Sequence, residues 1–450
     1  MTNQLSDFEF RREFIRAVSP RQGVAQQNAN YYVPVTDENI RGIDLCQRLM
    51  DTVELTFGDA VTLVTGPAGS GKTSELLRFG EQLATKHRSF IYADITDLLR
   101  SSEPLDAGRL LTGVVASLIS AVNSQSSKRR VKLDTRPFLQ RLKDAFGRLE
   151  ISGFDTAASV NAGPVQFSTT LHSALRDSLD FRKKVQHVIE NNRAQFRAEI
   201  HNIVKDLAKA LTHDDGQPPV FVVDSIEHFR GIDDQDAPNS YLRVRESVEQ
   251  IFSMYRDELT LPGLHVVYCV PSYVHCAWAN TLAMLNIKVF TPTGDVFKPG
   301  LRQLRGIAEK RAPQDGGLLR LLGTNTRIDE IMHASGGLFR DLFRLLDHVI
   351  SNASTLPASE RAVWNALAEC RRQFLGGPTG VSREQIMLLA QISTDTQYVP
   401  SREQQADFEF LETLGAILQY PNGPEGYWLG VHPMLKPVVD NVMASAKAPL

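Results

Sequence analysis

The sequence has few cysteines, no long apolar run and no strong excess of either charge. Its four cysteines are scattered, and the spacing of Cys269 and Cys276 fits neither a zinc knuckle nor a C-x-x-C redox pair. We therefore expect free structural thiols. No run approaches the ~18 apolar residues that span a bilayer, and the first residues lack a basic stretch followed by an apolar one. We expect a cytoplasmic protein with no membrane partner.

A net charge of −3 argues against a globally basic nucleic-acid binder, although it leaves room for local basic patches. The composition, 42% hydrophobic and 22% charged, is ordinary for a water-soluble globular chain. A length of 450 residues allows two or three domains, each with its own core.

Residues 66–73 read Gly-Pro-Ala-Gly-Ser-Gly-Lys-Thr and match the phosphate-loop pattern G-x-x-x-x-G-K-[ST] at every fixed position. An apolar, β-rich run at 60–65 precedes this loop, and an amphipathic helical pattern at 73–79 follows it. A chance glycine turn does not explain this order of strand, loop and helix. The pattern predicts binding of a nucleoside triphosphate, with ATP as the expected cofactor.

Each position of the loop suits phosphate binding. Glycine lets the backbone curl so that successive N–H groups and the helix N-terminus point at the phosphates. Lys72 is expected to bridge the β- and γ-oxygens, and the Thr73 hydroxyl is expected to coordinate Mg²⁺, which prefers oxygen ligands. The expected cofactor-binding residues of the loop are Gly66, Gly69, Ser70, Gly71, Lys72 and Thr73.

A second buried strand, residues 219–224, ends in Asp224, as expected of a phosphate-loop ATPase. Asp224 is expected to hold Mg²⁺, directly or through water. Glu227 follows three residues later and is the candidate for orienting or deprotonating the attacking water. Lys72, Asp224 and Glu227 are thus the expected catalytic residues. A helix-capping or salt-bridging Glu227 remains an alternative.

Further apolar runs at 89–94, 264–270 and 287–290 complete a predicted α/β domain with a parallel sheet. Ser272 follows the run at 264–270 and is a candidate sensor of the γ-phosphate. A simple strand-ending turn explains Pro271-Ser272 equally well.

A long, mostly helical insertion separates two of these strands, at about residues 100–214. Within it we expect a hairpin at 158–168 and charged helices over 170–212. Residues 128–148 hold eight basic and two acidic residues, a net charge of +6. Nucleic acid binding or a solvated helix face both fit this segment.

Beyond the sheet, composition predicts a helical lid and a winged-helix pattern of two helices and two strands. In the lid, Gly336-Gly337 starts a helix that carries Arg340, which is expected to reach a phosphate; a helix junction with a solvated arginine is the alternative. Tyr31 and Tyr32 could stack on adenine or fill a core. The expected parts are an N-terminal extension at 1–45, the ATPase domain at 46–296, the lid at 297–375 and the winged helix at 381–440.

The phosphate loop, the Asp224 strand, the Gly336-Gly337 motif and the winged-helix pattern together resemble the STAND branch of the AAA+-like ATPases, with origin-recognition-type ATPases as near relatives. The resemblance covers about residues 45–440. It implies that His432, in Val-His-Pro-Met-Leu at 431–435, touches the nucleotide in a closed, ADP-bound state. A purely structural histidine between apolar residues remains the alternative.

The chain departs from these families in two places. Leu338-Phe339 stands where many STAND proteins have proline, and residues 273–285 hold no arginine to act as an AAA+ arginine finger. Hydrolysis in trans within a ring is therefore disfavoured, although Arg243, Arg245, Arg302 or Arg305 could serve from elsewhere.

The resemblance implies a switch in signalling or antiviral defence that hydrolyses ATP slowly and forms a nucleotide-dependent homo-oligomer or engages a partner. No effector or repeat sensor is visible in the chain, so a separate protein would supply it. The alternative is a DNA-associated ATPase, such as an initiator, loader or transposition regulator. Residues 381–440 carry a net charge of −5, which disfavours a winged helix that grips DNA.

Overall fold

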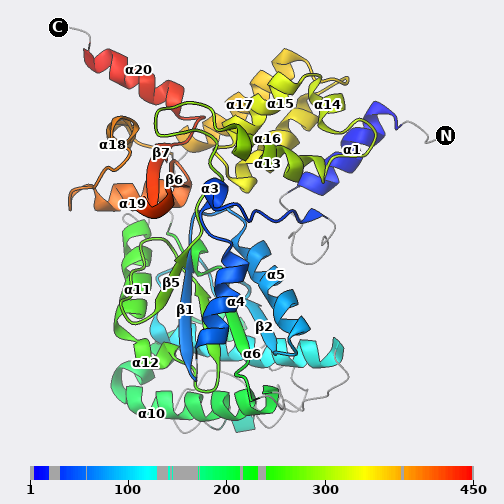
Figure 1. Ribbon diagram of the computed structural model, residues 1–450. Helices are drawn as coiled ribbons and strands as arrows, with labels where there is room; N and C mark the ends of the chain where they lie inside the picture. Colours follow the sequence, from blue (N-terminus) through cyan, green and yellow to red (C-terminus); the bar gives the residue numbers. More distant parts are fainter. Residues whose placement is uncertain are drawn as a thin grey trace. The chain divides into compact units, whose positions relative to one another are not determined.

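The structure is a computed structural model that describes residues 5–19, 31–56, 58–128, 140–141, 144, 171, 173–212, 216–231, 240–376 and 380–447 (Figure 1). It divides into two compact units. The first, here the sheet unit, comprises Cys46–Thr65 and Leu76–Leu282. The second, here the lid unit, comprises Met1–Leu45, Gly66–Glu75 and Ala283–Leu450.

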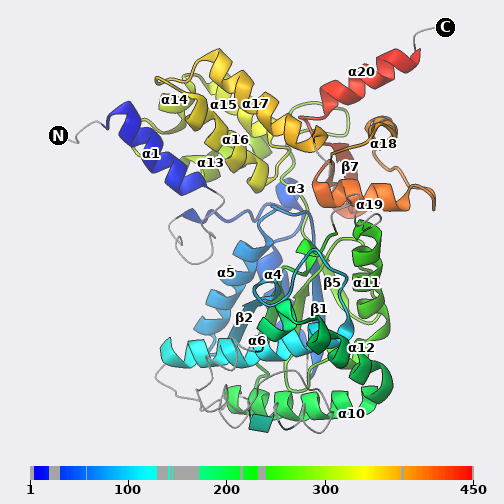
Figure 2. The same ribbon diagram turned by 180° about the vertical axis from the view of Figure 1, so that it is seen from behind.

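A five-stranded sheet forms the centre of the sheet unit (Figure 2), and its strands lie in the order β2-β3-β4-β1-β5. β2 pairs in parallel with β3, β3 with β4 and β4 with β1, so their carboxyl ends share one edge. β3 and β4 are buried along their whole length, as expected of parallel strands covered on both faces. The strands are β1 (Ala60–Thr65), β2 (Phe90–Asp94), β3 (Val220–Asp224), β4 (His265–Cys269) and β5 (Asn280–Ala283). The predicted α/β class with a parallel sheet is confirmed.

The expected strand at 287–290 is wrong. The fifth strand of the sheet is β5, in which only Leu282 is buried. Residues 287–290 are an extended segment of the lid unit with Ile287 and Val289 buried. In it, Lys288 N–H donates to Ile40 O at 2.8 Å and Val289 O accepts from Phe297 N–H at 2.9 Å. An apolar, β-branched run predicts an extended chain but not the partner that takes its hydrogen bonds.

Helices pack on the sheet, and two of them, α6 and α10, belong to the insertion. α6 buries an apolar stripe that packs on β2 and on α10, which bends at the non-helical residue Asn192. The buried faces of α6 and α10 therefore belong to the core of the sheet unit. The predicted hairpin at 158–168 and most of the basic segment at 128–148 lie outside the described residues. The helices here are α4 (Leu45–Leu55), α5 (Lys72–Thr85), α6 (Ala107–Lys128), α10 (Leu179–Leu211), α11 (Ser240–Met254) and α12 (Arg256–Leu259).

The lid unit is mainly helical. α1 starts with a Ser6–Glu9 capping box and buries Phe10 and Phe14 against α16, so part of the N-terminal extension belongs to the lid core. The helices are α1 (Asp7–Val18), α3 (Glu38–Arg41), α13 (Lys298–Glu309), α14 (Gly317–Leu322), α15 (Asn325–Ala334), α16 (Phe339–Asn352) and α17 (Glu360–Leu375).

The C-terminal part of the lid unit has the predicted succession of two helices and a hairpin. The strands β6 and β7 pair antiparallel, with Gln419 opposite Leu429. The elements are α18 (Arg383–Thr394), α19 (Gln405–Leu414), β6 (Ile417–Pro421), β7 (Tyr427–Val431) and α20 (Lys436–Lys447). Among the described residues, no helix is both long and apolar enough to cross a bilayer.

Two helical glycines give a matched test of packing. A Cβ built on Gly80 in α5 would lie 2.3 Å from Cε1 of Phe90, whereas a Cβ on Gly306 in α13 meets nothing within 4 Å. We expect Gly80→Ala to lower the free energy of unfolding by roughly 1–3 kcal/mol through overpacking. Gly306→Ala should raise it by roughly 0.5–1 kcal/mol, because alanine favours a helix.

Urea denaturation of the two variants and the wild-type protein measures both changes. A Gly80→Ala variant stabilised as much as Gly306→Ala would contradict the close approach of α5 to the Phe90 ring.

Candidate nucleotide-binding site

The phosphate loop begins at the residue after β1 and continues into α5. Gly66, Gly69 and Gly71 have φ of 141°, 85° and 94°, a region that favours glycine. A Cβ built on Gly69 would lie 2.3 Å from the Cβ of Arg340, and one on Gly71 would lie 2.8 Å from the Phe339 ring. Two of the three glycines are therefore needed for contact with the lid as well as for the curl.

Lys72 starts α5 and is 3% exposed. Its ammonium donates to Gly66 O at 2.9 Å and to Pro67 O at 3.0 Å. The cation therefore lies inside the curl of the loop, where it can meet an anionic ligand. Thr73 follows in the first turn of α5 and is half-buried, and Ser70 in the loop is buried.

Arg340 stands at the second position of α16. Its backbone N–H donates to Gly69 O at 3.2 Å. Its guanidinium instead binds both carboxylate oxygens of Asp341, at 3.0 and 3.1 Å, and the carbonyl of Leu414 at 3.2 Å. The structure thus brings the Arg340 backbone to the loop, while the side chain that was expected to reach a phosphate is paired with Asp341.

His432 is fully buried in the lid unit. Its Nδ1 accepts from Met434 N–H at 3.2 Å, which assigns the proton to Nε2, and Nε2 donates to Ser335 O at 3.2 Å. Burial lowers the pKa of His432 to about 4, and the nearby Asp341 carboxylate only partly opposes this. His432 therefore lies against the start of the Gly336-Gly337 motif as a neutral side chain.

Asp341 connects these lid residues. It is 1% exposed and contacts Arg340, Arg344 at 3.3 Å and His432 at 3.6 Å. Burial alone would raise the pKa of Asp341, but the guanidinium of Arg340, helped by that of Arg344, lowers it below its usual value. The carboxylate therefore stays charged and holds two arginines in place.

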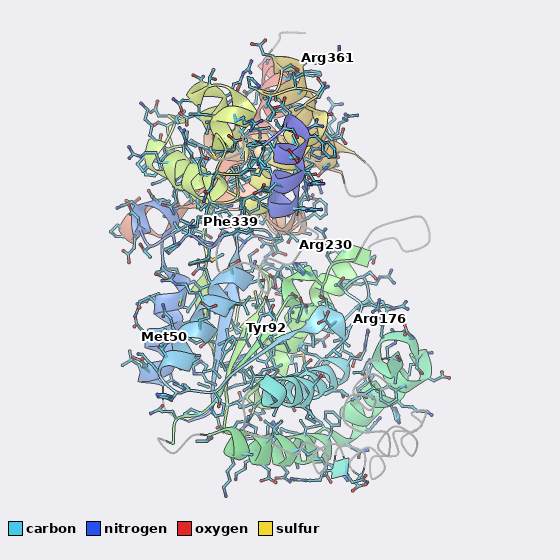
Figure 3. All side chains as sticks on the ribbon, turned by 90° about the vertical axis from the view of Figure 1, so that its right-hand side faces the viewer. Met50, Tyr92, Arg176, Arg230, Phe339 and Arg361 are labelled. Atoms are coloured by element: carbon cyan, nitrogen blue, oxygen red, sulfur yellow. The ribbon has the colours of Figure 1, made fainter. Side chains whose placement is uncertain are left out.

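Asp224 ends β3 and is wholly buried in the sheet unit. Tyr92 on β2, labelled in Figure 3, donates its hydroxyl to Asp224 Oδ2 at 2.7 Å, and Ser225 N–H donates to Oδ1 at 2.8 Å. Burial and the Asp224 carboxylate raise the pKa of Tyr92 well above its usual value, so its hydroxyl remains a donor. Two donors thus fix the carboxylate of Asp224.

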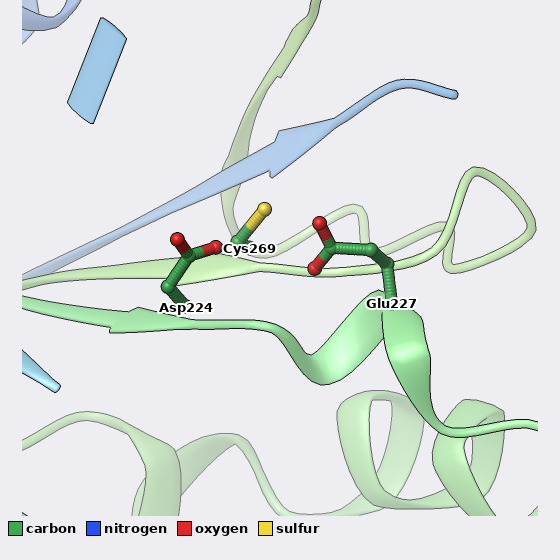
Figure 4. Close-up of side chains that lie close together, drawn as sticks. All are labelled: Asp224, Glu227 and Cys269. Atoms are coloured by element: carbon green, nitrogen blue, oxygen red, sulfur yellow. The ribbon is translucent and has the colours of Figure 1, made fainter. Parts of the chain in front are cut away.

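Ser225 has a left-handed backbone, φ 73°, and turns the chain into a short 3₁₀ helix, Ile226–His228. This turn brings Glu227, 8% exposed, back towards Asp224. One potential ligand atom each of Asp224, Glu227 and Cys269 lie within 4.8 Å of one another (Figure 4). The two carboxylates suit Mg²⁺, whereas the Cys269 sulfur is too soft a ligand to favour it.

The remaining predicted residues take less distinctive positions. Ser272 follows β4 by three residues and is half-buried. The guanidinium of Arg311 lies over the Tyr31 ring, 5.7 Å from the ring centroid. Tyr32 donates its hydroxyl to Glu75 at 2.9 Å. The sequence motifs do not mark Arg41, Tyr92 or Asp341 as site residues. Only Asp341 could have been found from the sequence, because it directly follows the predicted site residue Arg340.

The chain matches no protein-family model and no curated protein. Among solved structures it is similar to one described as the structure of the Aeropyrum pernix ORC2 protein in ADPNP–ADP complexes. The identity is 13%, the match covers 95% of this chain and 98% of that one, and the TM-score is 0.39.

The parallel α/β sheet, with strand, glycine loop and helix in succession, is the arrangement of a P-loop nucleotide-binding fold. The ORC2 likeness does not bear on the narrower STAND resemblance, which stays a prediction.

The burial of His432 predicts a pH-dependent stability. The folded-state pKa of about 4 lies below the ordinary value of 6.5, so the unfolded chain binds a proton that the folded chain does not. This stabilisation is complete above pH 6.5 and decreases as the pH falls towards 4. His432→Gln should reduce the loss of unfolding free energy between pH 7 and 5 by about 2 kcal/mol.

Urea titrations at both pH values, followed by tryptophan fluorescence, measure this difference. An equal pH dependence in wild type and His432→Gln would contradict the buried neutral state of the ring.

Proposed function

We propose that this protein is a Mg²⁺-dependent ATPase that hydrolyses slowly and acts as a nucleotide-controlled switch. The observation that carries this proposal is the direct contact between the lid helix α16 and the phosphate loop. Arg340 N–H donates to Gly69 O at 3.2 Å, and the Phe339 ring lies against Gly71. A ligand that shifts the loop backbone must therefore shift the start of α16 or break these contacts.

Hydrogen bonds within the lid unit would transmit such a shift from the start of α16 to the C-terminal elements. Arg340 holds the carbonyl of Leu414 at the end of α19, and His432 after β7 holds Ser335 before α16. Tyr420 on β6 adds a hydroxyl bond of 2.8 Å to Gly336 O. These three bonds tie the lid motif to the segment predicted as a winged helix. In the proposed cycle they are made in the closed, ADP-bound state and released with ATP.

The proposed chemistry divides among five residues. Lys72 neutralises the β- and γ-phosphate oxygens, and Ser272 senses the γ-phosphate. Thr73 and Asp224 would hold Mg²⁺, which would supply positive charge beside the phosphate oxygens. Glu227 orients the attacking water and takes its proton. The burial of Asp224 and Glu227 supports these roles, because a carboxylate acts more strongly where water is excluded.

Two substitutions test the site. Lys72→Ala removes the cation inside the loop and is expected to abolish nucleotide binding and to lower hydrolysis at least about 100-fold. Glu227→Gln should keep ATP binding and lower hydrolysis by roughly 10²–10⁴-fold, because the amide cannot accept the proton of water. Phosphate release and nucleotide titration measure the two effects separately.

The control for Lys72→Ala is Lys86→Ala, which removes an exposed lysine just after α5. It should leave both measurements unchanged. Hydrolysis by Glu227→Gln at the wild-type rate would show that Glu227 is not the base.

The switch could control either of two biological processes. The first is signalling or antiviral defence through a separate effector, as the STAND resemblance implies. The second is a DNA-associated ATPase, which the net charge of +6 at residues 128–148 favours, while the net charge of −5 at 381–440 argues against a DNA-gripping C-terminal segment.

Light scattering with ADP and with a slowly hydrolysed ATP analogue, on wild type and Lys72→Ala, separates these outputs. Assembly only with the analogue, lost in Lys72→Ala, would support an oligomerising switch. Fluorescence anisotropy with duplex DNA is the second arm, on wild type and on a Lys128→Gln, Arg129→Gln, Arg130→Gln variant. Salt-sensitive binding that weakens in the variant would support the DNA-associated role.

A further inference from the structure

Arg41 is a buried cation that the proposed catalytic set does not use. It ends α3 and is only 3% exposed, which is rare for arginine unless its charge is paired. Its Nη1 donates to Glu75 Oε1 at 3.2 Å, and its Nη2 donates to the carbonyl of Ser70 and lies 3.1 Å from Met284 Sδ. All these partners belong to the lid unit, and two of them belong to the phosphate loop and the first turn of α5.

The contact with Ser70 fixes a direction in the loop. In a trans peptide the carbonyl of one residue and the N–H of the next point in opposite directions. When Arg41 holds Ser70 O, the N–H of Gly71 must point to the other side of the peptide. Arg340 holds the preceding carbonyl, because its N–H donates to Gly69 O, while the N–H of Ser70 donates to Pro67 O at 3.2 Å. The two contacts fix the orientation of two consecutive peptides of the loop, and the second of them carries the Gly71 N–H.

Glu75 fixes the position of the Arg41 guanidinium. Its carboxylate accepts from Arg41 and from the Tyr32 hydroxyl, at 2.9 Å to Oε1 and 3.1 Å to Oε2. Burial lowers the pKa of Arg41, and the Glu75 carboxylate opposes this. The planar fork of arginine can serve Glu75 and Ser70 together, which the single ammonium of lysine cannot do with the same geometry.

Arg41 also touches the lid helix. Its guanidinium lies over the Phe339 ring, 5.3 Å from the centroid, and the same ring lies where a Cβ of Gly71 would be. One side chain therefore contacts the loop peptide that would face a phosphate and the first residue of α16.

We propose that Arg41 is a positioning residue that aims the Gly71 N–H at the phosphates and couples the loop to Phe339 of the lid. This inference rests on the proposed function, because it requires a nucleotide at the loop. Arg41 does not touch the nucleotide. It acts through the Ser70–Gly71 peptide and the Phe339 ring.

The test compares Arg41→Lys with Arg311→Lys. Arg311 is also buried in the lid unit, where it donates to Tyr31 O and Ile307 O and lies over the Phe343 ring, but it has no contact with the phosphate loop among those described. Both variants keep the charge and lose the planar fork. The readouts are the Kd for ADP and for a slowly hydrolysed ATP analogue, by calorimetry, together with thermal unfolding without nucleotide.

We expect Arg41→Lys to raise both Kd values about 10- to 100-fold, and Arg311→Lys to change them less than about threefold at a comparable loss of thermal stability. Hydrogen exchange of the start of α16 adds a readout of coupling. Nucleotide should change the exchange of residues 339–346 in wild type and in Arg311→Lys but not in Arg41→Lys.

Unchanged nucleotide affinity and unchanged exchange in Arg41→Lys would overturn the inference, as would equal weakening in Arg311→Lys. If Arg41→Lys does not fold, Phe339→Leu replaces it; this variant should keep binding within about tenfold and lose the nucleotide-dependent exchange, and an exchange response like that of wild type would overturn the coupling. A wild-type protein that binds neither nucleotide would overturn the proposed function itself, which is a different outcome from a normal wild type with a normal Arg41→Lys.

Discussion

The backbone of the phosphate loop is the constraint on which the lid unit depends. Four of its carbonyls meet a donor: Gly66 and Pro67 meet the ammonium of Lys72 inside the curl, Gly69 meets the N–H of Arg340, and Ser70 meets Arg41. The bond from Arg41 to Ser70 O turns the Gly71 N–H to the other side of that peptide. The loop geometry is thus supported by residues far apart in the sequence.

The lid unit also depends on a buried charge cluster around Asp341. Asp341 is an ionised carboxylate in the interior, surrounded by Arg340, Arg344 and a neutral His432. Such groups add little net stability, since desolvation offsets most of their attraction. Their value lies in geometry, because a buried carboxylate tolerates few arrangements of its donors. This explains how α16, the end of α19 and the segment after β7 keep one relative placement.

The sequence predicted the strands that carry the site because β3 and β4 are fully buried runs of β-branched residues. It failed at β5 and at 287–290 because the pattern records burial and not the identity of the hydrogen-bond partner. The loop residues and Asp224 were visible as motifs. Arg41 and Tyr92 were not, because their roles arise from contacts with residues more than 25 positions away, which no local spacing encodes.

Ser225 has a strained backbone between the two carboxylate residues Asp224 and Glu227. A left-handed backbone at a non-glycine residue costs roughly 1 kcal/mol, and it occurs here between Asp224 and the turn that carries Glu227. Glycine would remove this cost and would also widen the range of directions open to the chain at that point. The serine thus exchanges some stability for a narrower distribution of carboxylate positions. Glycine at this position would relieve the strain, but it would hold the second carboxylate less firmly.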